Sequence, residues 1–157
     1  MEKIGDSTRS VHVSAEPDKD TGSVQMPIYQ TSTYVQEDFA IHKGYEYART
    51  HNPTRDLVEA AIAELESPSV QAYGTAFASG MAAITTITQM LNSGSHIIAA
   101  SDLYGGTARL FDQVLSKFGI ETTYSNLNEG DLEKYARENT KMLWLESPTN
   151  PLLEVHD

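Results

Sequence analysis

Three consecutive residues, Ser79, Gly80 and Met81, have the types and order of an anion-binding helix start. The hydroxyl of Ser79 can cap a helix that begins at Gly80, and the missing side chain of Gly80 lets a bulky group approach the backbone. The first amides of a helix have no acceptor within it and carry partial positive charge, which favours phosphate. Taken alone, the stretch is more typical of an ordinary core helix with a serine cap.

Tyr47 and Arg49 are two residues apart, so both side chains point the same way if the segment is extended. A phenol and a guanidinium together can donate several hydrogen bonds to a phosphate. A packing tyrosine beside a surface arginine would give the same pattern. For this pair alone, that second interpretation is favoured.

Tyr104 lies on a loop just past an expected strand and is followed by Gly105 and Gly106. An aromatic ring there can stack on a planar ligand, and the two glycines keep its surroundings clear. A turn with a packing tyrosine is an equally good interpretation of this segment by itself.

Glu146 ends another expected strand and leads into a stiff polar loop that contains Asn150. The peptides before Pro148 and Pro151 could both be cis, which would fix Asn150 in place. The alternative is a plain proline-rich connection.

The apolar pattern predicts the elements that must position these residues. Asn52 as cap and Pro53 at the first helical position predict a helix that ends near Ser67. The helix from Gly80 to about Leu91 is apolar or hydroxylated on every side, which predicts that it is buried.

Beyond residue 94 the sequence alternates between short apolar runs and amphipathic segments. We expect strands at residues 95–100, 120–124 and 141–146, and helices at residues 107–118 and 131–138. This alternation is typical of an α/β fold with a mostly parallel sheet, in which ligands bind beyond the carboxyl ends of the strands. The loops that carry Tyr104 and Asn150 both begin at such ends.

Residues 1 to about 44 show no sustained helical period, although residues 28–35 are extended in character. We interpret residues 1–50 as an arm that is ordered by docking on a neighbouring subunit, rather than as a floppy terminus. Residues 51–157 would then be the first, incomplete part of an α/β domain.

The composition excludes several classes of function. The chain of 157 residues has 11 basic and 22 acidic side chains, a formal net charge of −11, which argues against nucleic acid and anionic membranes as partners. It contains no cysteine, so disulfides, thiolate zinc sites and a cysteine nucleophile are excluded. No histidine pair has metal-ligand spacing, and we expect no metal site. No apolar run suggests a signal peptide or a membrane span, and we expect a cytoplasmic protein.

Taken together, the motifs resemble the Cys/Met-metabolism family of pyridoxal-phosphate enzymes, which includes the cystathionine γ-synthases, γ-lyases and β-lyases and methionine γ-lyase. The matching segments are PIYQTST at 27–33, YEYARTHNPTR at 45–55, ASGMAA at 78–83, DLYGGT at 102–107 and ESPTNP at 146–151. They occur in the family's order and span nearly the whole chain. Each is weak alone, but five in register are highly specific.

The resemblance implies a role for each candidate residue in binding pyridoxal 5'-phosphate. Tyr104 would stack on the pyridine ring and could act as an acid or base. Asn150 would lie near the ring hydroxyl, with Glu146 supporting that region. The residues that would contact the phosphate are Ser79, Gly80 and Met81, together with Tyr47 and Arg49 of a neighbouring subunit.

The resemblance also implies a fold-type-I pyridoxal-phosphate transferase that makes or breaks the C–S bond of cystathionine or a related sulfur amino acid. The form of the motif around Tyr47 favours a γ-lyase or γ-synthase, with cystathionine β-lyase or methionine γ-lyase as alternatives. We expect a homo-oligomer, a tetramer built as a dimer of dimers with shared active sites.

The lysine that forms the Schiff base in this family comes after the matched segments, and none of the lysines of this chain fits its motif. We therefore expect an N-terminal portion that is inactive alone, accompanied by a second chain or a continuation carrying the remainder. The competing hypothesis is a non-catalytic chain that binds a partner subunit.

Overall fold

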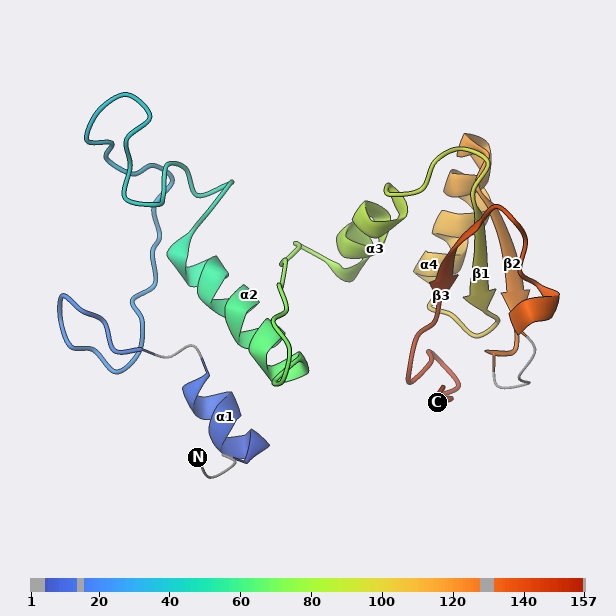
Figure 1. The fold of residues 1–157 in the computed structure, drawn as a ribbon, viewed down its shortest axis with the longest axis horizontal. Helices are drawn as coiled ribbons and strands as arrows, with labels where there is room; N and C mark the ends of the chain where they lie inside the picture. Colours follow the sequence, from blue (N-terminus) through green and yellow to red (C-terminus); the bar gives the residue numbers. More distant parts are fainter. Residues whose placement is uncertain (1–4, 14–15, 128–131, 157) are drawn as a thin grey trace. The chain divides into compact units, whose positions relative to one another are not determined.

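The computed structural model describes residues 5–13, 16–127 and 132–156. The chain divides into two compact units, Met1–Ala76 and Phe77–Asp157, which are described separately (Figure 1). This boundary lies further along the chain than the expected end of the arm near residue 50. The docking of the arm on a neighbouring subunit stays a prediction.

The described residues of the first unit form two helices, α1 (Asp6–His12) and α2 (Pro53–Glu66). Helix α2 begins as the sequence predicts, because the side chain of Asn52 accepts a hydrogen bond of 2.9 Å from the amide of Thr54. Helix α1 was not expected, since its short sequence has no apolar period. It is held to α2 by a 2.8 Å hydrogen bond from the guanidinium of Arg9 to the carbonyl of Glu64.

Outside these helices, the described residues of the first unit form irregular backbone with few buried side chains. Residues 32–34 pair with residues 46–48 through an antiparallel bridge between Thr33 and Tyr47. Several apolar side chains of this unit are exposed in this chain, among them Val35 at 89% and Phe39 at 94%. The apolar face of α2 is likewise uncovered in this chain, since Val58 and Ile62 are both more than half exposed.

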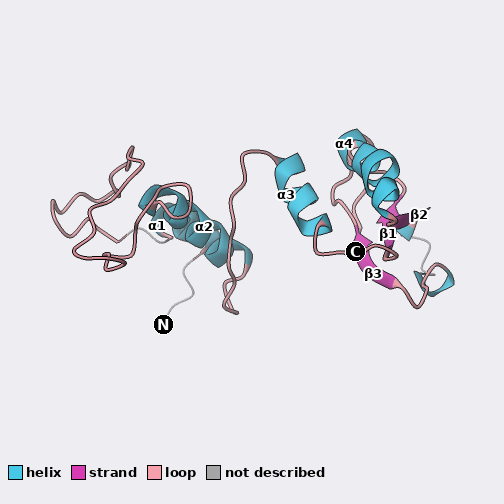
Figure 2. Ribbon diagram, turned by 90° about the horizontal axis from the view of Figure 1, so that it is seen from above, coloured by secondary structure: helices cyan, strands magenta, loops and turns pink. Residues whose placement is uncertain are grey.

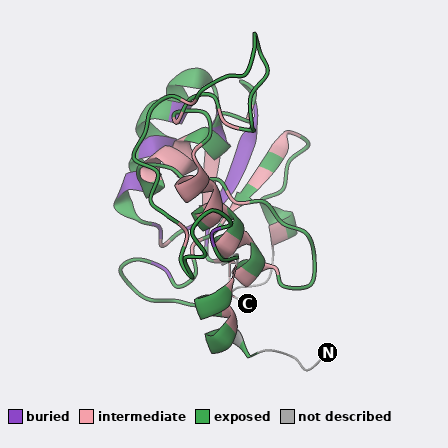
Figure 3. Ribbon diagram, turned by 90° about the vertical axis from the view of Figure 1, so that its left-hand side faces the viewer, coloured by how far each residue is buried: buried purple, intermediate pink, exposed green. Residues whose placement is uncertain are grey.

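The second unit is built on a parallel sheet of three strands, β1 (His96–Ala100), β2 (Glu121–Ser125) and β3 (Thr140–Trp144). The strand order is β2-β1-β3, and both neighbours of β1 run parallel to it. Strand β1 is fully buried, as the colouring of Figure 3 shows. The predicted parallel α/β arrangement is confirmed.

Helical segments pack on the sheet and complete this core (Figure 2). The ring of Phe111 meets the ring of Trp144 edge-on, with centroids 5.7 Å apart. Helix α3 (Gly80–Thr88) adds Met81 and Ile84 to the edge of the same core. Among the described residues, no helix is long and apolar enough to cross a membrane.

Three details of the second unit differ from the sequence-based expectation. The helix expected at 107–118 is three successive segments: α4 (Gly105–Arg109), the π-helix η1 (Leu110–Val114) and the 3-10 helix η2 (Leu115–Phe118). The helix expected at 131–138 is a 3-10 turn, η4 (Leu132–Lys134), and Asp131 lies outside the described residues.

The third difference concerns α3, which is mostly half-buried or exposed instead of buried. Within it Thr88 is the buried residue, while Ile87 is 43% exposed. An apolar pattern on all sides predicts that a helix will be covered, but it does not say that this stretch of chain supplies the cover.

Candidate functional site

The start of α3 has the geometry of an anion site. Ser79 is extended, and its hydroxyl accepts a 3.1 Å hydrogen bond from the amide of Ala82, as a helix cap does. Its carbonyl accepts from the amide of Ala83 at 3.2 Å. The amides of Gly80 and Met81 have no acceptor inside the helix. Nothing lies within 4 Å of the position that a Cβ atom on Gly80 would take, so this end is open.

Tyr104 immediately precedes α4 and is 46% exposed. Its ring packs on the backbone of Gly106, where an added Cβ would collide with the ring carbon Cε1. The same Cβ position lies 2.9 Å from the Sδ atom of Met81. The structure thus brings Tyr104 beside the first turn of α3, at the point where Gly106 leaves room for both side chains.

Glu146 connects the loop after β3 to the loop after β1. Its Oε2 atom accepts a 2.8 Å hydrogen bond from the backbone amide of Tyr104, and its Oε1 atom accepts a 2.9 Å bond from the hydroxyl of Thr107. The indole N–H of Trp144 donates to Oε1 at 3.5 Å. One carboxylate therefore holds both ends of the short segment that carries the Tyr104 ring.

The loop that carries Asn150 is fixed from within and from the loop after β1. Thr149 is buried, and its hydroxyl accepts a 2.8 Å bond from the amide of Glu154. The amide of Leu152 donates to the carboxylate of Asp102 at 3.3 Å. Both X-Pro peptides in this loop are cis, one of the arrangements considered from the sequence. Asn150 itself is exposed.

Tyr47 and Arg49 lie together in the first unit, and both are exposed. The guanidinium carbon of Arg49 is 5.0 Å from the centroid of the Tyr47 ring, which is a cation–π distance. The guanidinium of Arg55 steadies this turn by donating to the carbonyls of Ala48 and Thr50, at 3.2 and 2.5 Å. The pair therefore offers hydrogen-bond donors from a braced segment of backbone.

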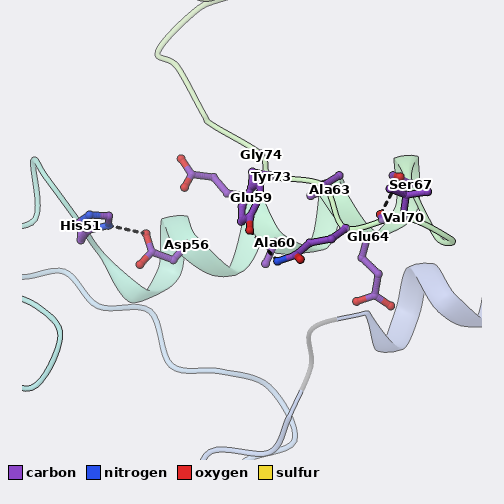
Figure 4. A pocket seen from close by; sticks show the side chains of 12 residues that line it. His51, Asp56, Glu59, Ala60, Ala63, Glu64, Ser67, Val70, Tyr73 and Gly74 are labelled. Carbon is purple, nitrogen blue, oxygen red and sulfur yellow. Dashed lines mark hydrogen bonds and ion pairs between the residues drawn. The ribbon is translucent and has the colours of Figure 1, made fainter.

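A pocket in the first unit lies between α2 and residues 70–74 (Figure 4). None of the candidate residues lines it. Its wall on α2 carries the carboxylates of Asp56, Glu59 and Glu64. These negative charges would repel a phosphate, so the pocket does not compete with the start of α3 as an anion site.

Two residues of the DLYGGT motif to which the sequence analysis gave no role, Asp102 and Thr107, support the candidate site. Thr107, in α4, is fully buried and Asp102, in the loop after β1, is half-buried, and each makes a hydrogen bond to the loop after β3. No sequence signal identifies such pairs, because their partners are 39 and 50 residues away. In the described part of the chain, no group of three or more His, Cys, Asp or Glu side chains could hold a metal ion.

Comparison with known proteins identifies the family. The family model described as Cys/Met metabolism PLP-dependent enzyme matches residues 7–157. The chain belongs to this family. The membership confirms the resemblance deduced from the five motifs.

Individual members of the family resemble this chain in sequence and in structure. A cystathionine gamma-lyase of Bacillus subtilis (strain 168) is 47% identical over 151 residues, covering 96% of this chain and 39% of the relative. A cystathionine beta-lyase of Coxiella burnetii is 43% identical over 152 residues, covering 96% and 38%. The crystal structure of metB from Corynebacterium glutamicum superposes with a TM-score of 0.89 at 39% identity, covering 99% and 40%.

A second solved structure, cystathionine gamma-lyase from Lactobacillus plantarum complexed with L-serine, has a TM-score of 0.88 at 43% identity, covering 97% of this chain and 39% of that one. These likenesses confirm the expected fold, the first part of a fold-type-I pyridoxal-phosphate enzyme. The chain spans about two fifths of the length of the family members it matches.

Proposed function

We propose that the protein carrying these residues is a pyridoxal-phosphate enzyme that makes or breaks the C–S bond of cystathionine or a related sulfur amino acid. The observation that carries the proposal is the placement of Tyr104 beside the first turn of α3, with Gly106 between them. An anion site next to an exposed aromatic ring matches the two ends of pyridoxal 5'-phosphate.

The residues present fit this cofactor. The amides of Gly80 and Met81 and the hydroxyl of Ser79 would hold the phosphate, aided by the positive end of α3. The exposed part of the Tyr104 ring would stack on the pyridine ring. Asn150 would approach the ring hydroxyl from the loop after β3.

In the reaction, the residues of this chain bind, orient and move protons. When bound, pyridoxal 5'-phosphate supplies an electron-accepting ring that makes proton removal at the substrate α carbon feasible. Tyr104 would hold the ring plane and could use its hydroxyl to accept or donate a proton next to the substrate. The lysine that completes the family's site would come from the part of the protein beyond these residues.

We further propose a homotetramer in which Tyr47 and Arg49 reach the phosphate of a neighbouring subunit. The exposed side chains of Val35 and Phe39 support this proposal, since exposed apolar side chains on the arm are stabilised when another protein surface covers them. An acidic chain also needs a guanidinium close to an anionic cofactor. The acidic, cysteine-free composition is in keeping with a cytoplasmic location, which we propose.

The reaction is tested by assaying the whole protein, loaded with pyridoxal 5'-phosphate, against a panel of sulfur amino acids. Release of 2-oxobutyrate from cystathionine is the expected result, since a γ-enzyme breaks the bond at the γ carbon. Release of pyruvate would instead indicate a β-lyase. Cofactor-free protein is the control. A protein that binds the cofactor but acts on no sulfur amino acid would contradict the proposal and favour a partner-binding role.

A further inference from the structure

We infer that Glu146 is a positioning residue, which sets the plane of the Tyr104 ring without touching the cofactor itself. The inference rests on the proposed function, because the ring matters for catalysis only if it stacks on a ligand. It assigns to Glu146 a task that differs from contact with the ring hydroxyl.

All three hydrogen-bonding groups around Glu146 are donors, so both of its carboxylate oxygens must act as acceptors. Oε2 accepts from the amide of Tyr104 at 2.8 Å, while Oε1 accepts from the hydroxyl of Thr107 at 2.9 Å and faces the indole N–H of Trp144 at 3.5 Å. An ionised carboxylate has acceptor sites on both oxygens and no proton to donate, so it matches three donors. A glutamine side chain would turn an N–H toward one of them.

The two clamped atoms lie at opposite ends of the segment that presents the ring. The amide of Tyr104 and the hydroxyl of Thr107 enclose Gly106, on whose bare backbone the ring rests. Thr107 is fully buried, so its hydroxyl has no water to replace a lost partner. Loss of the carboxylate would therefore release both ends at once and let the ring turn away from Met81.

A second carboxylate links the same two loops, with the acceptor on the loop after β1 and the donor on the loop after β3. Asp102, on the loop after β1, accepts from the amide of Leu152 on the loop after β3 at 3.3 Å. Glu146, on the loop after β3, accepts from the amide of Tyr104 on the loop after β1. The loops that carry Tyr104 and Asn150 are thus joined reciprocally, so that the two groups expected at the ring move together.

The test measures the dissociation constant of pyridoxal 5'-phosphate for the cofactor-free whole protein by titration of visible absorbance. Glu146→Gln keeps the shape of the side chain and removes half of its acceptors. We expect it to weaken binding about tenfold and to reduce the visible circular dichroism of the bound cofactor, which reports a fixed ring orientation. Glu133→Gln, at an exposed position on η4, is the matched control and should bind within about twofold of wild type.

A double-mutant cycle separates positioning from general support of the fold. If Glu146 acts through the ring, Glu146→Gln should cost little further affinity in a protein that already carries Tyr104→Ala. If Glu146→Gln lowered the affinity for pyridoxal 5'-phosphate by the same factor in wild-type protein and in the Tyr104→Ala variant, the inference would be overturned. The thermal unfolding midpoints of the cofactor-free variants, measured beside the cycle, show whether each variant is folded, and Thr107→Val provides a second variant that removes one clamp alone.

The outcomes distinguish the inference from the function on which it rests. Wild-type protein that does not bind pyridoxal 5'-phosphate would overturn both. Wild-type binding that is unchanged in Glu146→Gln would overturn the positioning role and leave the proposed function standing. Weaker binding with unchanged visible circular dichroism would also count against positioning, since the ring would then be held in its original orientation.

Discussion

The Sδ atom of Met81 lies 2.9 Å from the position that a Cβ atom would take on Gly106. The ring of Tyr104 crowds the same position from another side, and Gly106 is buried. The closeness of the proposed anion site to the aromatic ring therefore depends on a residue without a side chain.

Gly106→Ala should separate the two halves of the site. The added methyl group would have to displace either the thioether of Met81 or the ring of Tyr104, and such overpacking typically costs about 1–3 kcal/mol. We expect roughly tenfold weaker binding of pyridoxal 5'-phosphate and a lower unfolding midpoint. Gly105→Ala is the matched control, because its Cβ would meet the side chain of Arg109 at an acceptable 3.4 Å. Equal effects of the two substitutions would contradict the packing described here.

Gly80→Asp should damage cofactor binding by charge. Space for a side chain exists at Gly80, since nothing lies within 4 Å of its Cβ position. A carboxylate there would repel a phosphate and neutralise the positive helix end, so we expect about a tenfold or greater loss of affinity for pyridoxal 5'-phosphate. Gly80→Asn has the same shape without the charge and should lose far less. Identical dissociation constants for the two variants would count against the anion site.

The local parts of the fold and site could be predicted from the sequence. Asn52 caps α2 and Ser79 caps α3 as expected, because a cap depends on residues within one turn of the chain. The parallel sheet followed from the alternation of elements. Tyr104 follows β1 as expected, whereas β3 ends at Trp144, so Glu146 lies in the loop beyond the strand and not at its last position.

The remaining features depend on contacts that a local pattern does not contain. Helix α1 has no apolar face, and its link to α2 joins residues 55 positions apart. The apolar period of residues 107–118 predicts a single covered face, yet Val114 and Phe118 are 43% and 65% exposed. The π-helical turn at Leu110–Val114 shifts the register of that face, which no count of apolar residues could indicate.

His96 should make the second unit less stable in acid. Its ring is fully buried in β1, with Nδ1 2.8 Å from the hydroxyl of Thr140 and Nε2 2.9 Å from that of Thr123. Burial lowers the pKa of His96 below its ordinary value of 6.5; the positive charge of Arg137 lowers it further, and Glu121 opposes the change. Because the unfolded chain then binds the proton more readily, the free energy of unfolding should fall as the pH drops below about 6.5.

The measurement for His96 is the unfolding midpoint of wild type and His96→Gln at several pH values between 8 and about 5. The variant should be less stable at pH 8 and should lose less stability on acidification. His12→Gln, on the exposed helix α1, should keep the wild-type pH dependence. A His96→Gln profile parallel to that of wild type would show that this histidine is not the group responsible.

Mixed oligomers should test whether Arg49 acts on a neighbouring subunit. At a concentration of pyridoxal 5'-phosphate well below their dissociation constants, Arg49→Ala subunits and Gly80→Asp subunits would each be nearly inactive, but a pair formed from one of each would contain one site free of both changes. Random mixing should then restore about a quarter of the sites. Mixing Gly80→Asp with Gly106→Ala, two changes expected in the same half of the site, should restore none. Mixed oligomers that form and stay inactive would place Arg49 in the site of its own subunit.

The most direct test of the proposed site is a crystal structure of the whole protein with pyridoxal 5'-phosphate bound. We predict that phosphate oxygens lie within hydrogen-bond distance of the amides of Gly80 and Met81, with the pyridine ring stacked on Tyr104. A cofactor whose phosphate lies away from the start of α3, or whose ring does not face Tyr104, would contradict this account.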